Sequence, residues 1–148
     1  MTIDGTPDRP ARSALWPQLS VRRGRAAVDF YRSAFGAVEV YRVGGDAENE
    51  AVVAQLEIGG AAVWVADESP ENGNFSPETL GGGSIRMILT VADPDAMFAR
   101  AVAAGARQVS AVEEAYGWRV GRLVDPFGHH WEVGRPLEQM SMTADARA

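Results

Sequence analysis

The residues best suited to chemistry lie in the segment VDPFGHHWEV (124–133). Its first half is a tight-turn sequence, because Pro126 fixes its own φ angle and Gly128 tolerates a positive φ. The turn leads into a strand in which Trp131 and Glu132 must point to opposite faces of a sheet. We therefore expect Trp131 on the packed side and the carboxylate of Glu132 in whatever space the sheet encloses.

Two histidines, His129 and His130, stand between this turn and the strand. A histidine pair suggests metal binding, but adjacent residues on a strand point to opposite faces, so we expect a structural or solvated role for both. They are expected beside the turn rather than on the face that Glu132 occupies. The chain has no cysteine, which excludes disulfides, thiolate metal sites and a cysteine nucleophile.

Composition limits the classes of protein that remain. A chain of 148 residues with 46% hydrophobic content fits one globular domain, or two small modules sharing a core. A formal charge of −6 argues against nucleic-acid binding, which needs a basic stripe. With neither a signal-peptide pattern nor an apolar run near about 18 residues, we expect a cytoplasmic protein without a membrane partner.

The elements that position these residues follow one order twice. The first pass predicts a strand at 15–21, a helix at 25–35 ended by Gly36, and strands at 38–43, 51–58 and 61–66, the last two joined by a hairpin at Gly59 and Gly60. The second pass predicts a strand at 85–91, a helix at 94–104 with Asp93 as its N-cap and Gly105 as its end, and strands at 106–110, 119–124 and 130–133.

Placing Val21 on Val91 brings the two helices and their terminating glycines into near register at a period of roughly 70 residues, which marks a repeated unit. The sequence thus predicts two βαβββ modules, at 14–67 and 84–135. The segments 1–13 and 136–148 lack sustained periodicity, so we expect a disordered N-terminal tail and a poorly ordered C-terminal tail. The segment 68–83 between the modules, rich in Gly and Pro, is either a spacer or a lid in which Phe75 covers a ligand.

The helix and the turn together resemble the glyoxalase/bleomycin-resistance protein/dioxygenase (vicinal oxygen chelate) superfamily. Its recurrent helix pattern A-x-x-F-Y-x-x-x-[LF]-G is matched by Ala27, Phe30, Tyr31, Phe35 and Gly36, and its closing motif D-P-x-G-x-x-[aromatic/aliphatic]-E by 125–132. The resemblance covers 15–134. It implies an α+β fold of two tandem βαβββ modules forming cupped mixed sheets, a fold that hosts isomerases, dioxygenases, thiol transferases and antibiotic-binding proteins.

The resemblance also points to four positions, because metal-binding members place one ligand on the first and one on the fourth strand of each module. Here those positions fall on Trp16, Trp64, Arg86 and Glu132. Indole offers no lone pair to a metal and guanidinium is a permanent cation, so only Glu132 can ligate. We therefore predict neither a metal nor another cofactor.

Without a metal, the same positions predict a different pocket. Its expected ligand-binding residues are Trp16, Trp64, Arg86, Trp118, Tyr116, Glu132 and Phe75. Trp16 and Trp64 would offer aromatic faces on neighbouring strands, and Trp118 and Tyr116 would rim the mouth from the loop before the closing hairpin. Arg86 and Glu132 would meet as an opposite-charge pair inside the same cavity. The alternatives are core filling for the tryptophans and a structural salt bridge for the charged pair.

Three functions stay open on the sequence. The first is a non-catalytic protein that binds a small aromatic or drug-like molecule. The second is an enzyme of the superfamily, a lyase, isomerase or dioxygenase, with Glu132 as general base and Arg86 as oxyanion partner, or with Glu132 among the ligands of a metal. The third is a vestigial site on a protein that acts by pairing with another chain. In each case the resemblance implies a homodimer.

Overall fold

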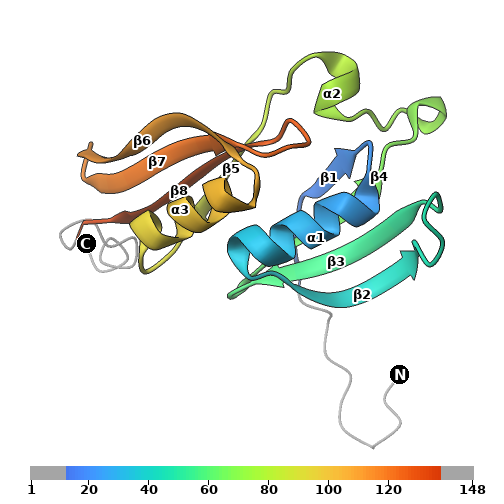
Figure 1. The fold of residues 1–148 in the computed structure, drawn as a ribbon, viewed down its shortest axis with the longest axis horizontal. Helices are drawn as coiled ribbons and strands as arrows, with labels where there is room; N and C mark the ends of the chain where they lie inside the picture. Colours follow the sequence, from blue (N-terminus) through green and yellow to red (C-terminus); the bar gives the residue numbers. More distant parts are fainter. Residues whose placement is uncertain (1–12, 138–148) are drawn as a thin grey trace, which may run out of the picture.

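The computed structural model describes residues 13–137, so the predicted tails lie almost wholly outside the described residues. The described chain forms two four-stranded sheets, each carrying one long helix (Figure 1). The first module comprises β1 (Gln18–Val21), α1 (Gly24–Phe35), β2 (Val38–Gly44), β3 (Val52–Ile58) and β4 (Ala61–Asp67). Its strand order is β1-β4-β3-β2, with β1 parallel to β4 and the other pairs antiparallel.

The second module repeats this topology. It comprises β5 (Arg86–Thr90), α3 (Pro94–Ala104), β6 (Arg107–Ala115), β7 (Trp118–Val124) and β8 (His130–Pro136), in the order β5-β8-β7-β6. Between the modules lie a 3-10 turn, η1 (Pro70–Asn72), and a short helix, α2 (Pro77–Leu80). The predicted fold of two βαβββ modules is therefore confirmed.

Local signals explain where both long helices begin and end. α1 stops at Gly36, whose φ of 69° is left-handed, a conformation that glycine adopts without strain. α3 begins at Asp93, whose side chain accepts a hydrogen bond from the backbone N–H of Ala96, and Pro94 occupies its first position. The predicted bounds of α3, 94–104, coincide with the observed ones.

Some predicted strand bounds were wrong. β1 begins at Gln18 rather than Leu15, because Pro17 has no N–H to continue the ladder. β6 runs on to Ala115, well beyond the predicted end at Ser110. β7 begins at Trp118, which follows a turn with positive φ at both Tyr116 and Gly117, as tight hairpins require. The prediction of a loop at Trp118 is therefore wrong.

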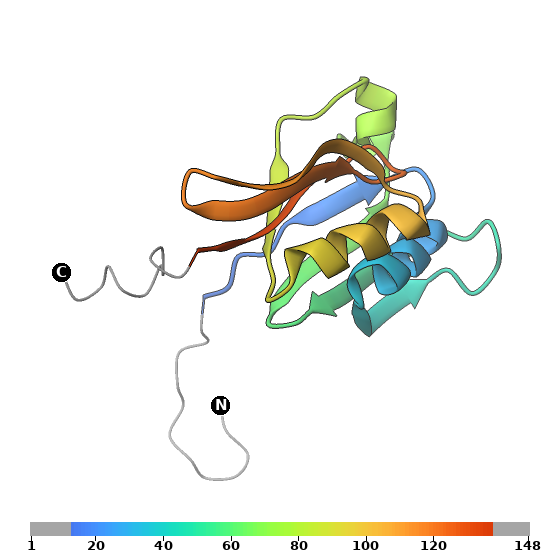
Figure 2. The same ribbon diagram turned by 60° about the vertical axis from the view of Figure 1, so that its left-hand side comes forward.

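The core lies where the two long helices meet each other and their sheets (Figure 2). Tyr31 and Phe35 of α1 pack against Trp131 of β8, with ring centroids 5.6 and 4.6 Å apart. The first module's helix thereby completes the core of the second module, and the prediction that Trp131 faces the packed side is confirmed at 2% exposure.

A buried carboxylate fixes this junction. Asp125, only 4% exposed, accepts hydrogen bonds from the hydroxyl of Tyr31 and, at 2.9 Å, from the indole N–H of Trp131. It also accepts hydrogen bonds from the backbone N–H groups of Phe127 and His129, at 2.9 and 3.0 Å. Burial, with the charge of Asp125, raises the pKa of Tyr31 well above its usual value. The turn carboxylate therefore serves the fold.

Each sheet has a helix face and an opposite face that no helix of its own module covers, which we call the open face. Strand residues alternate between them, as Leu19 and Val21 are buried while Gln18 is exposed. The first open face carries Gln18, Gln55, Ala62 and Trp64, and the second carries Arg86, Ile88, Arg122, His130 and Glu132. Any site that the sheets build must lie on these faces.

Candidate functional site

The predicted charged pair is present on the second open face. Arg86 of β5 and Glu132 of β8 form a salt bridge of 2.5 Å between Nη1 and Oε2. Their side chains are 44% and 24% exposed, so the guanidinium is not buried. The pair therefore lies at the edge of a solvent-accessible space.

Two further residues, His130 and Arg122, join the pair on this face. His130 lies opposite Arg86 in the parallel register of β5 and β8, and Arg122 lies opposite Glu132 in the register of β7 and β8. The expectation that His130 sits apart from the face of Glu132 is wrong. The sequence carried the signal, because residues two apart on a strand share a face.

Arg122 and His130 are joined by a contact of 3.3 Å between Nη2 and Nδ1. A guanidinium has no acceptor, so Nδ1 of the imidazole must accept, and in the neutral ring the proton then resides on Nε2. Burial lowers the pKa of His130, and the positive charges of Arg122, Arg86 and Arg107 lower it further. The imidazole is therefore held neutral with its Nε2–H as a donor.

Two adjoining cavities open on this face. One, of about 320 Å³, combines apolar surface with charged and polar side chains, and we call it the polar cavity; it is lined by Gly83, Ser84, Ile85, Arg86, Ile88, Arg122, His130 and Glu132. The other, of about 310 Å³, is mainly apolar and is lined by Ile88, Ala115, Tyr116, Trp118, Val120, Glu132 and Gly134. Ile88 and Glu132 line both, so the two cavities are neighbours.

Tyr116 and Trp118 line the apolar cavity, and they belong to a hairpin rather than to the predicted loop. Tyr116 is 98% exposed at the tip of the β6–β7 hairpin. Trp118 begins β7, where it pairs with Ala115 and Pro136.

The two other tryptophans lie on the first module and reach neither cavity. Trp64 packs edge-on against Tyr41, with centroids 5.9 Å apart, on the first open face. Trp16 precedes β1 and is 45% exposed. Within one chain the prediction that both share a cavity with Arg86 and Glu132 is therefore wrong, because each sheet has its own open face.

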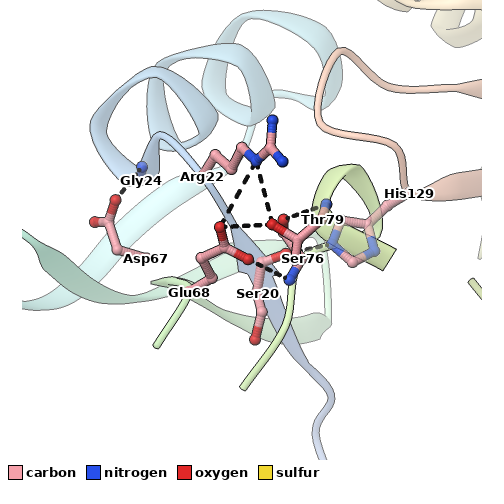
Figure 3. A network of polar contacts seen from close by, with 8 residues as sticks. All are labelled: Ser20, Arg22, Gly24, Asp67, Glu68, Ser76, Thr79 and His129. Carbon is pink, nitrogen blue, oxygen red and sulfur yellow. Dashed lines mark hydrogen bonds and ion pairs between the residues drawn. The ribbon is translucent and has the colours of Figure 1, made fainter. Parts of the chain in front are cut away.

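The segment between the modules is tied down by hydrogen bonds (Figure 3). Glu68 accepts from the backbone N–H of Ser76 at 2.8 Å and from the hydroxyl of Thr79 at 2.8 Å. The pKa of Glu68 is lowered, chiefly by the bond from Ser76. Phe75, proposed as a lid, is 43% exposed and lines neither cavity.

His129 connects the modules near this segment, with its Nε2 3.0 Å from the backbone carbonyl oxygen of Ser20 (Figure 3). Because a carbonyl can only accept, Nε2 carries a proton and donates it. A structural role, as expected, accounts for this histidine.

The superfamily's metal positions do not fit a metal in this chain. Trp64 and Arg86 bring no donor atom, and the carboxylate of Glu132 is paired with a guanidinium. Within residues 13–137, no three His, Asp or Glu side chains come together as a metal-binding group. The residues at these positions are therefore unsuited to form a divalent-metal centre.

Comparison with known proteins gives one family. The family described as glyoxalase-like domain matches residues 7–134. A protein of Mycobacterium bovis is 42% identical over 133 residues, which cover 87% of this chain and 87% of that protein.

Two solved structures share the fold. That of an Arabidopsis thaliana protein superposes with a TM-score of 0.63 at 29% identity, covering 84% of this chain and 98% of the other. TnmS3 from Streptomyces sp. CB03234, an antibiotic binding protein, gives a TM-score of 0.63 at 22% identity, covering 86% and 99%. Among residues 13–137, none of the helices combines the length and apolar character that crossing a membrane requires.

Proposed function

The chain belongs to the glyoxalase-like domain family, and we propose a function for it on that basis. We propose that it binds a small aromatic or drug-like molecule on the second open face, without a metal. One observation carries the proposal: an apolar cavity bordered by Ile88 and Trp118 adjoins a polar one at Glu132. Ligand sites typically combine such an apolar wall with a few polar groups that fix orientation. The antibiotic binding protein with the same fold agrees with this use.

Trp118 provides the test. We expect N-phenyl-1-naphthylamine, an uncharged aromatic fluorophore, to bind and to quench tryptophan emission by energy transfer. Trp118→Ala should weaken binding about tenfold, because it removes one aromatic wall of the cavity.

Phe75→Ala is the matched control, since the aromatic ring of Phe75 is 43% exposed and lines neither cavity. It should leave the affinity unchanged. Equal losses in both variants, or no saturable binding to the unaltered protein, would contradict the proposed site and favour a protein whose role is interaction with another chain.

We also propose that the protein works as a homodimer in the cytoplasm. Both open faces expose large apolar side chains, with Tyr41 52% and Ile88 66% exposed. A second copy that covers such side chains would remove apolar surface from water.

Light scattering at micromolar concentration measures this directly. We expect twice the 15.8 kDa mass of one chain. A mass equal to one chain would overturn the proposal and leave the ligand site to a single module.

A further inference from the structure

Arg122 differs from Arg86, the other arginine that lines the two cavities, because among residues 13–137 it is partly buried without a counter-ion. Its Nε has neither solvent exposure nor a hydrogen-bond partner. Among residues 13–137 its one hydrogen-bond contact is the neutral ring of His130, and no carboxylate lies within salt-bridge distance of it. Removing a charge from water is costly unless an opposite charge compensates it.

Glu132 lies opposite Arg122 in the strand register, yet it does not neutralise it. The carboxylate is engaged by Arg86 instead. Arg86, Glu132 and Arg122 together therefore carry one positive charge that is not neutralised. That charge lies on Arg122. Arg86, which we expected among the ligand-binding residues, already has Glu132 as its partner.

The neutral form of His130 adds a second donor to the polar cavity. With Nδ1 accepting from Arg122, its hydrogen is on Nε2, and both residues line the same 320 Å³ space. A guanidinium beside an imidazole N–H donor is suited to an oxyanion, which accepts several hydrogen bonds at once.

We infer that the ligand carries an acidic group, a carboxylate, phosphate or sulfonate, bound by Arg122 and His130, and an aromatic or aliphatic portion that lies against Trp118. The inference rests on the proposed function and narrows the ligand to one chemical class. The apolar cavity receives one end of the molecule, and the polar cavity receives the other across Ile88 and Glu132.

Two fluorescent probes test this class. 8-Anilinonaphthalene-1-sulfonate and N-phenyl-1-naphthylamine share one aromatic framework, and only the first carries an anion. We expect the sulfonate to bind about tenfold or more tightly than the neutral probe. Arg122→Gln should abolish that preference while leaving the affinity for the neutral probe unchanged.

Two other variants sharpen the result. Arg135→Gln removes the same charge from β8 at a residue that lines neither cavity, so the preference should persist. Glu132→Gln should strengthen sulfonate binding, because it removes a repelling charge and frees Arg86. This gain of affinity does not depend on Arg122→Gln folding normally.

The outcomes separate the two proposals. If both probes bind through Trp118 with equal affinity and Arg122→Gln has no effect, the acidic class is overturned while the proposed function stands. If Arg135→Gln weakens the sulfonate as much as Arg122→Gln does, general charge and not this site explains the preference. If neither probe binds, the proposed function itself fails.

Discussion

The two open faces occupy equivalent places in a repeated fold and carry opposite chemistry. In the first sheet Trp64 lies between Gln18 and Gln55 in the strand register. In the second sheet Glu132 lies in the same way between Ile88 and Arg122. The first face is thus aromatic and amide-lined at these positions, whereas the second is charged.

The helix faces show no such divergence. Leu19 and Val65 of the first sheet correspond to Leu89 and Val133 of the second, and all four are buried. Packing against a helix demands apolar residues of similar size, whereas a face that no helix covers makes no such demand. Folding therefore requires apolar side chains on the helix face of each sheet only. The residues of the open face can vary and are available for binding.

The largest difference between the modules lies at their closing hairpins. The β7–β8 connection contains Asp125, whereas β3 and β4 are joined by Gly59 and Gly60 alone. Asp125→Ala leaves Tyr31 and Trp131 without their acceptor in a buried place. We expect a loss of about 3 kcal/mol or more of unfolding free energy, measured by urea denaturation.

The matched change in the first hairpin is Gly60→Ala. A Cβ there meets open space, and its φ is not left-handed, so stability should change little. If both substitutions destabilised the protein equally, the claim that the carboxylate of Asp125 fixes the junction between the modules would be wrong.

A smaller difference concerns how closely each helix approaches its sheet. Gly121 of β7 corresponds to Ala54 of β3, and a Cβ at 121 would lie 2.8 Å from the ring of Phe98. Gly121→Ala should cost about 1 to 3 kcal/mol through overpacking. A neutral result in thermal denaturation would show that α3 can shift outward.

The charged face should also give the protein a pH dependence that the first face cannot supply. Burial and the nearby arginines hold the pKa of His130 below its ordinary 6.5. As the pH falls through 6.5, His130 becomes protonated in the unfolded chain but stays neutral in the folded protein. The free energy of unfolding therefore decreases. His130→Gln should remove this part of the loss in denaturation series from pH 8 to pH 5, and an unchanged slope would contradict it.

The smallest effect is expected from the ion pair itself. Because the side chains of Arg86 and Glu132 are 44% and 24% exposed, water screens them. Glu132→Gln should cost only about 0.2 to 1 kcal/mol. If urea denaturation showed that the free energy of unfolding falls by several kcal/mol, the ion pair would stabilise the fold. The second open face would then also contribute to stability.

The sequence predicted those parts of the molecule that depend on local signals. The N-cap at Asp93, the stop at Gly36 and the turn before β8 each have a chemical cause within a few residues. Counting along the repeat also brought Arg86 and Glu132 together, because the strand register preserves the spacing.

Other features depended on partners that the sequence does not reveal. β6 is an edge strand with mostly exposed residues, so it lacks the alternation that marks a half-buried strand. Arg122 gains significance only from the register that sets it opposite Glu132. Trp16 and Trp64 were placed in the wrong cavity because sequence spacing does not tell which face of a sheet meets its neighbour.

The bond between Tyr31 and Asp125 joins residues 94 positions apart. During synthesis α1 is therefore made long before the turn whose carboxylate accepts a hydrogen bond from Tyr31, and until then that hydroxyl must bond to water. Contacts of such sequence separation slow folding and tie both halves into one cooperative transition. The two modules resemble independent units because they repeat one topology. The contact between Tyr31 and Asp125 nevertheless makes them a single folding unit.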